Sequence, residues 1–177
     1  MARHKHRYDS LFEWYFYPLN PLWAWAMTAV ESAFKPLVQS PVGARGLMQV
    51  MPATWYNEAG ARWKTRYDGF DVEQNIKRGA RELKSCFSIF RNPQGFERYK
   101  ICTAAYNAGR RHIISAQLLA TKGNKDERLW RDVADYLPQI TGERSAETIN
   151  HILRVEAAFI GEGGKLQDLV ATPVDNH

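Results

Sequence analysis

The sequence predicts an all-α fold, and three observations lead to this prediction. Between residues 72 and 90, apolar residues recur at steps of three and four, which is the periodicity of one helix face. Asn20 followed by Pro21 is typical of a helix start, because Asn caps free backbone N–H groups and Pro fits the first turn. No segment shows the apolar–polar alternation of a half-buried strand. The chain has 177 residues, 45% of them apolar, which favours one domain with a sizeable core.

The order of the expected helices follows from these periodicities and from the breakers between them. Helices are expected over residues 8–17, 21–31, 72–90, 98–108, 112–121, 127–137 and 146–160. Residues 33–55 are expected to form loop and short helix, because Pro and Gly interrupt them. Pro138 is expected to close the helix before it, and Ser145 to cap the last one. We expect a single domain over 1–160 and a C-terminal tail over 161–177.

The net charge restricts the classes of partner, and the cysteine spacing restricts the kinds of metal site and disulfide. The formal net charge is +5 and the pI about 9.3, which favours anionic partners, but the basic residues are spread along the chain. No zinc finger, RNA-binding aromatic signature or Arg-rich tail accompanies them, so a solvated basic surface is favoured over a nucleic-acid site. Cys86 and Cys102 match no metal spacing. Buried free thiols are expected, with one bridge between neighbouring helices left open. No metal or cofactor is expected.

The N-terminus imitates a signal peptide, because the basic "MARHKHR" precedes an aromatic run. Glu13, Pro18 and Pro21 interrupt that run. The only Ala-x-Ala site, at 24–26, would remove most of the helix that carries Glu31. The same interruptions argue against a membrane span. We therefore expect neither a secretion signal nor a transmembrane segment.

Glu31 ends the most apolar predicted helix, "PLWAWAMTAVE". A carboxyl group beside Trp, Met and Val is poorly solvated, so its pKa is expected to rise. A raised pKa suits a general acid that works near neutral pH. From Glu31 alone, the alternative of an exposed glutamate at a helix end is favoured, because most helical glutamates face water.

The residues after Glu31 change that preference. "ESAFKPLVQSPVGARGLMQVMPAT" (31–54) resembles the signature of the soluble lytic transglycosylase (SLT) family. Further family motifs are "DVEQNI" (71–76), "AAYNAG" (104–109) and the weaker "ETINH" (147–151). The resemblance covers about residues 8–160. It implies a lysozyme-like helical domain, of the SLT or goose-type kind, with an active-site cleft.

The first motif implies roles for five residues. Glu31 matches the sole catalytic acid/base of the family, and Ser40 matches a serine that contacts the substrate near that glutamate. Gly46, Met48 and Gln49 match the cleft wall that holds the sugar at the cutting site.

The later motifs imply further substrate-binding residues. Tyr106 and Asn107 match residues that line the cleft near the glutamate, and Glu147 matches a second, deeper glutamate. The family has a tyrosine four residues after it, where this chain has His151. Glu147 and His151 would share a helix face, so we expect His151 to become charged and to pair with Glu147. The alternative is an exposed histidine of no consequence.

Elementary chemistry supplies a second interpretation for several motif residues. Gly43 and Gly46 are expected to allow a positive φ or a close backbone approach to a sugar. Met48 offers an adaptable apolar surface or simply fills the core. Asp71 and Asn75 are interpreted as helix cap and loop-ordering residue rather than as chemical groups.

The resemblance implies an enzyme that acts on peptidoglycan glycan strands. The counterpart of Glu31 protonates the β-1,4 oxygen between N-acetylmuramic acid and N-acetylglucosamine, then takes a proton from the sugar's 6-hydroxyl, and a 1,6-anhydro ring forms. One alternative is a muramidase that uses water and a second carboxylate such as Asp68 or Glu58. Others are a non-catalytic wall-binding or virion structural protein and, more distantly, a nucleic-acid-binding protein.

A chain without export information and little larger than a catalytic domain is expected to be a bacteriophage product. It would be located in the virion, with other virion proteins as partners, or in the host cytoplasm before release to the periplasm and cell wall as an endolysin.

Overall fold

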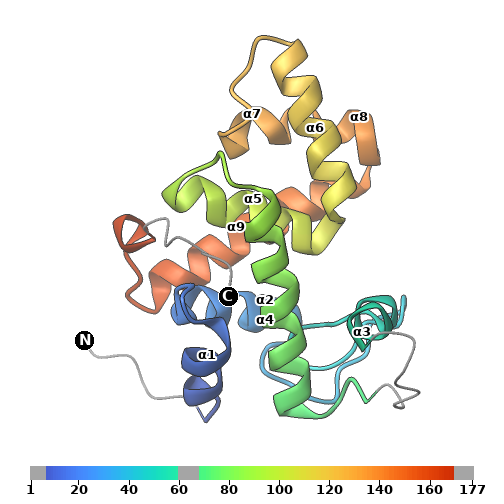
Figure 1. Cartoon of the computed structure of the whole chain (residues 1–177), viewed down its shortest axis with the longest axis vertical. Coiled ribbons are helices and arrows are strands. Elements are labelled where there is room, and N and C mark those ends of the chain that lie inside the picture. The colour runs from blue at the N-terminus through green and yellow to red at the C-terminus, as the bar shows by residue number, and fades with distance from the viewer. Residues whose placement is uncertain (1–6, 60–67, 170–177) are drawn as a thin grey trace. The chain divides into compact units, whose positions relative to one another are not determined.

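The computed structural model describes residues 7–59 and 68–169, with side chains only to Trp55 in the first range. The chain divides into two compact units, an N-terminal unit (Met1–Glu82) and a C-terminal unit (Leu83–His177). The elements of both are helices (Figure 1), and the β pairing among the described residues is limited to two isolated bridges, Gln39 with Arg45 and Arg45 with Val50. The predicted all-α, lysozyme-like class is confirmed.

In the N-terminal unit, α1 (Asp9–Phe16) packs against α2 (Pro21–Ser32), and α3 (Pro52–Ala59) follows the loop. The predicted start of α2 is confirmed, because the Asn20 side-chain oxygen accepts a hydrogen bond from the Leu22 N–H at 2.9 Å. Large apolar side chains with almost no exposure form the core of this unit: Phe12, Phe16, Trp23, Met27, Leu47, Met48 and Ile76.

The long helix α4 (Val72–Ile89) crosses the boundary, with residues 72–82 in the N-terminal unit and 83–89 in the C-terminal unit. Asp71 caps it as predicted, since its carboxylate accepts a hydrogen bond from the Gln74 N–H at 2.7 Å. The expected apolar face of α4 is buried at Ile76, Ala80 and Leu83.

The C-terminal unit contains α5 (Gly95–Ala108), α6 (Arg110–Lys122), α7 (Trp130–Ala134), α8 (Leu137–Thr141), α9 (Arg144–Gly161) and the 3-10 helix η1 (Leu166–Asp168). Helix α5 contacts α6 and α9, and α6 in turn contacts α7 and α8, which Figure 1 shows in yellow and orange. Cys86 and Cys102 are buried free thiols, as expected, and burial raises the pKa of the Cys102 thiol well above its ordinary value.

Several helix boundaries differ from the prediction. Helix α5 begins at Gly95 rather than Arg98. The expected helix over 127–137 is instead two short helices, and Pro138 lies in the first turn of α8, where its missing N–H costs nothing. Ser145 lies inside α9, not at its cap, and its hydroxyl donates to the Gly142 carbonyl at 2.7 Å.

The C-terminal part of the described chain continues beyond α9. Leu169, which follows η1, is 1% exposed, and η1 contacts α5. The expectation of one domain over 1–160 with a tail over 161–177 stays a prediction. No helix among the described residues combines the length and apolar character that crossing a membrane requires.

Candidate active site

Glu31 lies in the last turn of α2, half-buried, at a point where the chain bends sharply. The helix is followed by Ala33 at φ 50° and Phe34 at φ 58°, both in the left-handed region that costs free energy for residues other than glycine. The Phe34 ring packs against Trp25 of the same helix, with 4.8 Å between the ring centroids. This packing offsets the backbone strain and fixes the direction in which the chain leaves Glu31. The raised pKa expected for Glu31 stays a prediction.

The turn of α2 before Glu31 is tied to the loop that follows it. The hydroxyl of buried Thr28 lies 2.9 Å from the Ala24 carbonyl oxygen and 2.7 Å from the sulfur of Met48. The first contact is within the helix and the second reaches across to the loop. The loop therefore has a fixed position relative to the helix that carries Glu31.

Asn75 holds the loop over residues 38–50 in place from the first turn of α4. Its side chain has no exposure, and it makes three hydrogen bonds. The carbonyl end accepts from the Met48 N–H at 2.7 Å. The amide end donates to the Arg45 and Gly69 carbonyl oxygens at 2.8 and 2.9 Å. The prediction that Asn75 orders the loop is confirmed, and this one side chain bonds to three backbone groups.

The two loop glycines have the positive φ that was predicted, 90° at Gly43 and 75° at Gly46. A Cβ added at Gly46 would overlap the Gly69 carbonyl oxygen and the side chain of Asn75, whereas one added at Gly43 would meet nothing within 4 Å. The close approach that glycine permits at Gly46 is therefore to the Asn75 clamp.

Ser40 and Gln49 are both half-buried and both bond to their own loop. The Ser40 hydroxyl accepts from the Ala44 N–H at 3.0 Å, and the Ser40 N–H donates to the Ala44 carbonyl at 2.9 Å. Gln49 has φ 47°, and its Nε2 donates to the carbonyls of Gly46 and Val38 at 2.9 and 3.3 Å. Its Oε1 accepts no hydrogen bond from the residues that the structure describes. These contacts orient both side chains without occupying every polar atom.

Met48 lies in the core of the N-terminal unit. Its side chain has no exposure and packs beside Gly79 of α4. The expected adaptable surface at this position is therefore absent, and the core-filling alternative holds. The place of Met48 in the cleft wall that holds the sugar stays a prediction.

Four predicted site residues belong to the C-terminal unit, and two of them end α5. Tyr106 and Asn107 are half-buried in its last turn. The Asn107 side-chain oxygen accepts a hydrogen bond from the hydroxyl of Thr148 on α9, at 2.8 Å. Thr148 was not predicted as a site residue from the sequence. Its spacing from Ile152 and Val155 places it on the buried face of α9, and that periodicity is the signal that could have identified it.

Glu147 and His151 lie at different depths on α9. Glu147 is exposed, whereas His151 is 3% exposed. Burial, with a smaller effect from Arg154, lowers the pKa of His151 to about 4. The expected charging of His151 is wrong, because burial removes the water that would solvate the imidazolium ring. The alternative of an exposed histidine is wrong as well.

The muramidase alternative names Asp68 and Glu58, of which the structure describes the side chain of Asp68 alone. Asp68 is exposed, and its carboxylate accepts a hydrogen bond from the Phe70 N–H at 3.2 Å. The Glu58 side chain lies outside the described residues. Within the described ranges, no three His, Cys, Asp or Glu side chains gather closely enough to hold a metal ion.

Comparison with known proteins identifies the family. Residues 17–129 match the family model described as the transglycosylase SLT domain. The membrane-bound lytic murein transglycosylase F of Shewanella denitrificans is 35% identical over 134 residues, which are 74% of this chain and 26% of that protein. The chain thus spans about a quarter of the length of the curated relatives it matches.

Solved structures agree with this match. The 70 kDa soluble lytic transglycosylase of Escherichia coli superposes with a TM-score of 0.66 at 28% identity, over 93% of this chain and 26% of that one. The complex of the 70 kDa soluble lytic transglycosylase with bulgecin A gives a TM-score of 0.69 at 26% identity, over 94% and 26%. The family motifs at 31–54, 71–76 and 104–109 all lie within the matched residues. The chain belongs to the transglycosylase SLT domain family.

Proposed function

We propose that the chain is a peptidoglycan lytic transglycosylase, which cleaves the β-1,4 bond between N-acetylmuramic acid and N-acetylglucosamine and forms a 1,6-anhydro ring. The observation that carries the proposal is the placement of Glu31 in a member of this family. A half-buried carboxyl group ends α2, beside a loop whose backbone is clamped by a buried side chain. Such a fixed carboxyl group is suited to proton transfer at a bound substrate.

In the proposed reaction, Glu31 acts twice. Its protonated carboxyl group first donates a proton to the glycosidic oxygen, and the bond from that oxygen to C1 of the muramic acid breaks. The neighbouring acetamido group stabilises the positive charge that develops at C1. The ionised Glu31 then accepts the proton of the 6-hydroxyl as O6 bonds to C1. One proton leaves and one returns, so Glu31 ends as it began and no water is consumed.

In the N-terminal unit, the loop over residues 38–50 supplies the proposed sugar contacts. The free Oε1 of Gln49 can accept a hydrogen bond from a sugar hydroxyl, because the amide end already bonds to the loop, and half-buried Ser40 presents a further polar atom. The substrate contacts of Tyr106 and Asn107, in the C-terminal unit, stay a prediction from the family motif. We assign Asn75 as the positioning residue of this loop, since it contacts backbone groups rather than substrate.

The first test is Glu31→Gln. Loss of the proton donor is expected to lower the initial rate of turbidity loss of purified sacculi by at least about a hundredfold. The matched control is Glu13→Gln, at an exposed position of α1, which is expected to retain the wild-type rate. Circular dichroism should show equal helix content in both variants. A Glu31→Gln protein that still clears sacculi would refute the assignment of Glu31.

Mass spectrometry of the soluble products tests the reaction itself. Muropeptides that end in 1,6-anhydro-N-acetylmuramic acid are expected. Reducing muramic acid ends alone would replace the proposal by the muramidase alternative, with Asp68 as the first residue to substitute. Binding of sacculi without any release of products would indicate a wall-binding protein.

The bacteriophage role stays a prediction from the sequence. Immunodetection of the chain in purified virions would support a virion enzyme. Its presence only in lysates of infected cells would support an endolysin instead, and its presence in uninfected cells would contradict both.

A further inference from the structure

The C-terminal unit has a groove that none of the assigned residues uses. A hollow of about 300 Å³ lies between the turn at 91–94 and helix α6. It continues into a second hollow of about 570 Å³ beside residues 126–128. The two share Arg91, Asn92 and Glu127 as lining residues, so together they form one surface feature, which we call the α6 groove. Its size is within the range typical of sites for small ligands.

The α6 groove carries charges of both signs. Arg91 donates one hydrogen bond, from its Nε to the Ser88 carbonyl at 2.8 Å, and its two terminal nitrogens bond to no described residue. The Glu127 carboxylate accepts one long hydrogen bond, from the Thr121 hydroxyl at 3.4 Å. A guanidinium fork and a carboxylate therefore lie on the same groove with hydrogen-bonding capacity that the protein leaves to a ligand or to water.

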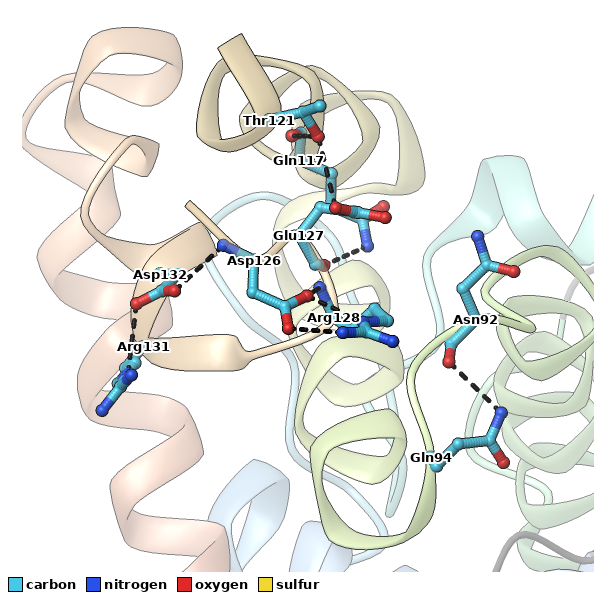
Figure 2. Close-up of polar contacts among 9 residues, drawn as sticks. All are labelled: Asn92, Gln94, Gln117, Thr121, Asp126, Glu127, Arg128, Arg131 and Asp132. Atoms are coloured by element: carbon cyan, nitrogen blue, oxygen red, sulfur yellow. Dashed lines mark hydrogen bonds and ion pairs between the residues drawn. The ribbon is translucent and has the colours of Figure 1, made fainter. Parts of the chain in front are cut away.

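The wall that carries Glu127 is ordered by the contacts drawn in Figure 2. Arg128 binds the Asp126 carboxylate through two hydrogen bonds of 2.9 and 2.8 Å, and reaches from it toward the turn that carries Asn92. The Asp126 N–H donates to Asp132 at 3.1 Å, and Gln117 donates to the Glu127 carbonyl at 2.8 Å. The segment thus binds its own polar groups locally, and the position of Glu127 is fixed before any ligand arrives.

The apolar part of the groove is aliphatic. Ile89 and Ile114 line it and are 43% and 39% exposed, so they offer aliphatic surface to an occupant. The one aromatic residue of the lining, Phe90, is only 3% exposed and offers no ring face. A sugar, which stacks on exposed aromatic faces, is therefore a poor occupant.

We propose that the α6 groove binds a short zwitterionic peptide of the kind that branches from peptidoglycan glycan strands. Its carboxylate would pair with Arg91 and its side-chain ammonium group with Glu127. Methyl and methylene groups of alanine and of the diamino acid would cover Ile89 and Ile114. Glu127 and Asp126 balance the charges of Arg91 and Arg128, so the groove offers no net attraction to a purely anionic polymer such as nucleic acid. The identity of the ligand rests on the proposed function, because the stem peptide is part of the same polymer.

The test is binding of an isolated stem tetrapeptide (L-Ala–γ-D-Glu–diaminopimelate–D-Ala) to the full chain, followed by NMR. The peptide has no glycosidic bond, so the result is independent of turnover. Wild type is expected to bind, with amide shifts at residues 91–94 and 126–128. Arg91→Gln and Glu127→Gln should each weaken binding about tenfold, because each removes a hydrogen bond to a charged group. Arg154→Gln, on exposed α9, is the control and should bind as wild type.

A change in the ligand identifies which carboxylate of the peptide pairs with Arg91. Conversion of the γ-D-Glu α-carboxylate to its amide should weaken binding to wild type about tenfold but hardly alter binding to Arg91→Gln, since the two changes remove the same contact. Absence of binding at millimolar peptide, or equal affinity of wild type and both groove variants, would overturn the proposal. If the peptide binds as expected while sacculi yield no anhydro products, the proposed reaction is wrong, but the proposal of peptide binding in the α6 groove is supported.

Discussion

The loop over residues 38–50 and the segment over residues 124–129 satisfy backbone N–H groups in the same way but differ in burial. Both are irregular stretches in which a side-chain oxygen satisfies a backbone N–H. In the first, Asn75 accepts from Met48 with no exposure of its side chain. In the second, Asp126 accepts from the N–H of exposed Arg128, and the same two side chains form an ion pair. The geometry is comparable, and the difference lies in burial.

Burial decides how much each arrangement contributes to stability. A buried backbone group that loses its partner cannot bond to water, so the full desolvation cost remains. An exposed ion pair gains little over the solvated charges, and its long side chains lose entropy. We therefore expect the first region to tolerate almost no change and the second to tolerate many.

The strongest test of this comparison is Asn75→Ala. It would leave the Met48 N–H and the Gly69 carbonyl without the Asn75 side chain, while the Arg45 carbonyl would keep its bond from the Val50 N–H at 3.0 Å. The free energy of unfolding should fall by about 3–5 kcal/mol, measured by urea denaturation. A conservative Asn75→Asp keeps only the acceptor function and should recover part of the loss. In any variant that remains folded, kcat on sacculi should fall more than KM rises, since the loop is misplaced rather than removed. A loss below about 1 kcal/mol would show that the clamp is dispensable.

Gly46→Ala tests the same region through its backbone. The added Cβ would overlap the Gly69 carbonyl and Asn75 at a φ of 75°, so a loss of about 2–3 kcal/mol is expected. Gly43→Ala is the matched control, because its φ of 90° is equally unfavourable but its surroundings are open. The control should lose only about 1 kcal/mol from strain alone. Equal losses of unfolding free energy in the two variants would mean that the residues around Gly46 move to accommodate the methyl group without cost.

His151 tests whether burial has a large effect on stability in the C-terminal unit as well. It is buried in the C-terminal unit, and its folded-state pKa of about 4 lies below the ordinary value of about 6.5. The unfolded chain therefore binds the proton more readily between these values, and stability falls as the pH falls through that window. Between pH 7 and pH 5 this group should cost about 2 kcal/mol of unfolding free energy. His151→Gln, which cannot titrate, should lose correspondingly less over the same range, and parallel curves for both proteins would contradict the burial argument.

The smallest effect is expected at the exposed ion pair. Arg128→Ala should leave the urea midpoint unchanged within error, because salt and water screen the pair. The pKa of Asp126, lowered to about 2 by its hydrogen bonds from Arg128, should rise toward the ordinary value of about 3.9. Carboxyl-carbon NMR titration measures this directly. A clear fall in the unfolding free energy of Arg128→Ala would contradict the claim that the exposed ion pair contributes little to stability.

The sequence by itself determined the features that depend on neighbours in the chain. The caps at Asn20 and Asp71, the apolar face of α4 and the positive φ of Gly43 and Gly46 were all predicted. Local rules suffice for these features, because the groups that interact are at most a few residues apart. The motif after Glu31 likewise gave the family, since it is contiguous.

Only the tertiary structure decided how deeply each motif residue is buried and what it contacts. Met48 was compatible with a cleft wall or a core, and packing beside Gly79 placed it in the core. His151 was expected to be charged, but its surroundings exclude water and keep it neutral. The bond from Thr148 to Asn107 joins residues 41 positions apart. Solvent exclusion and long-range pairing are properties of the assembled fold, because no short stretch of sequence carries the side chains that will surround it.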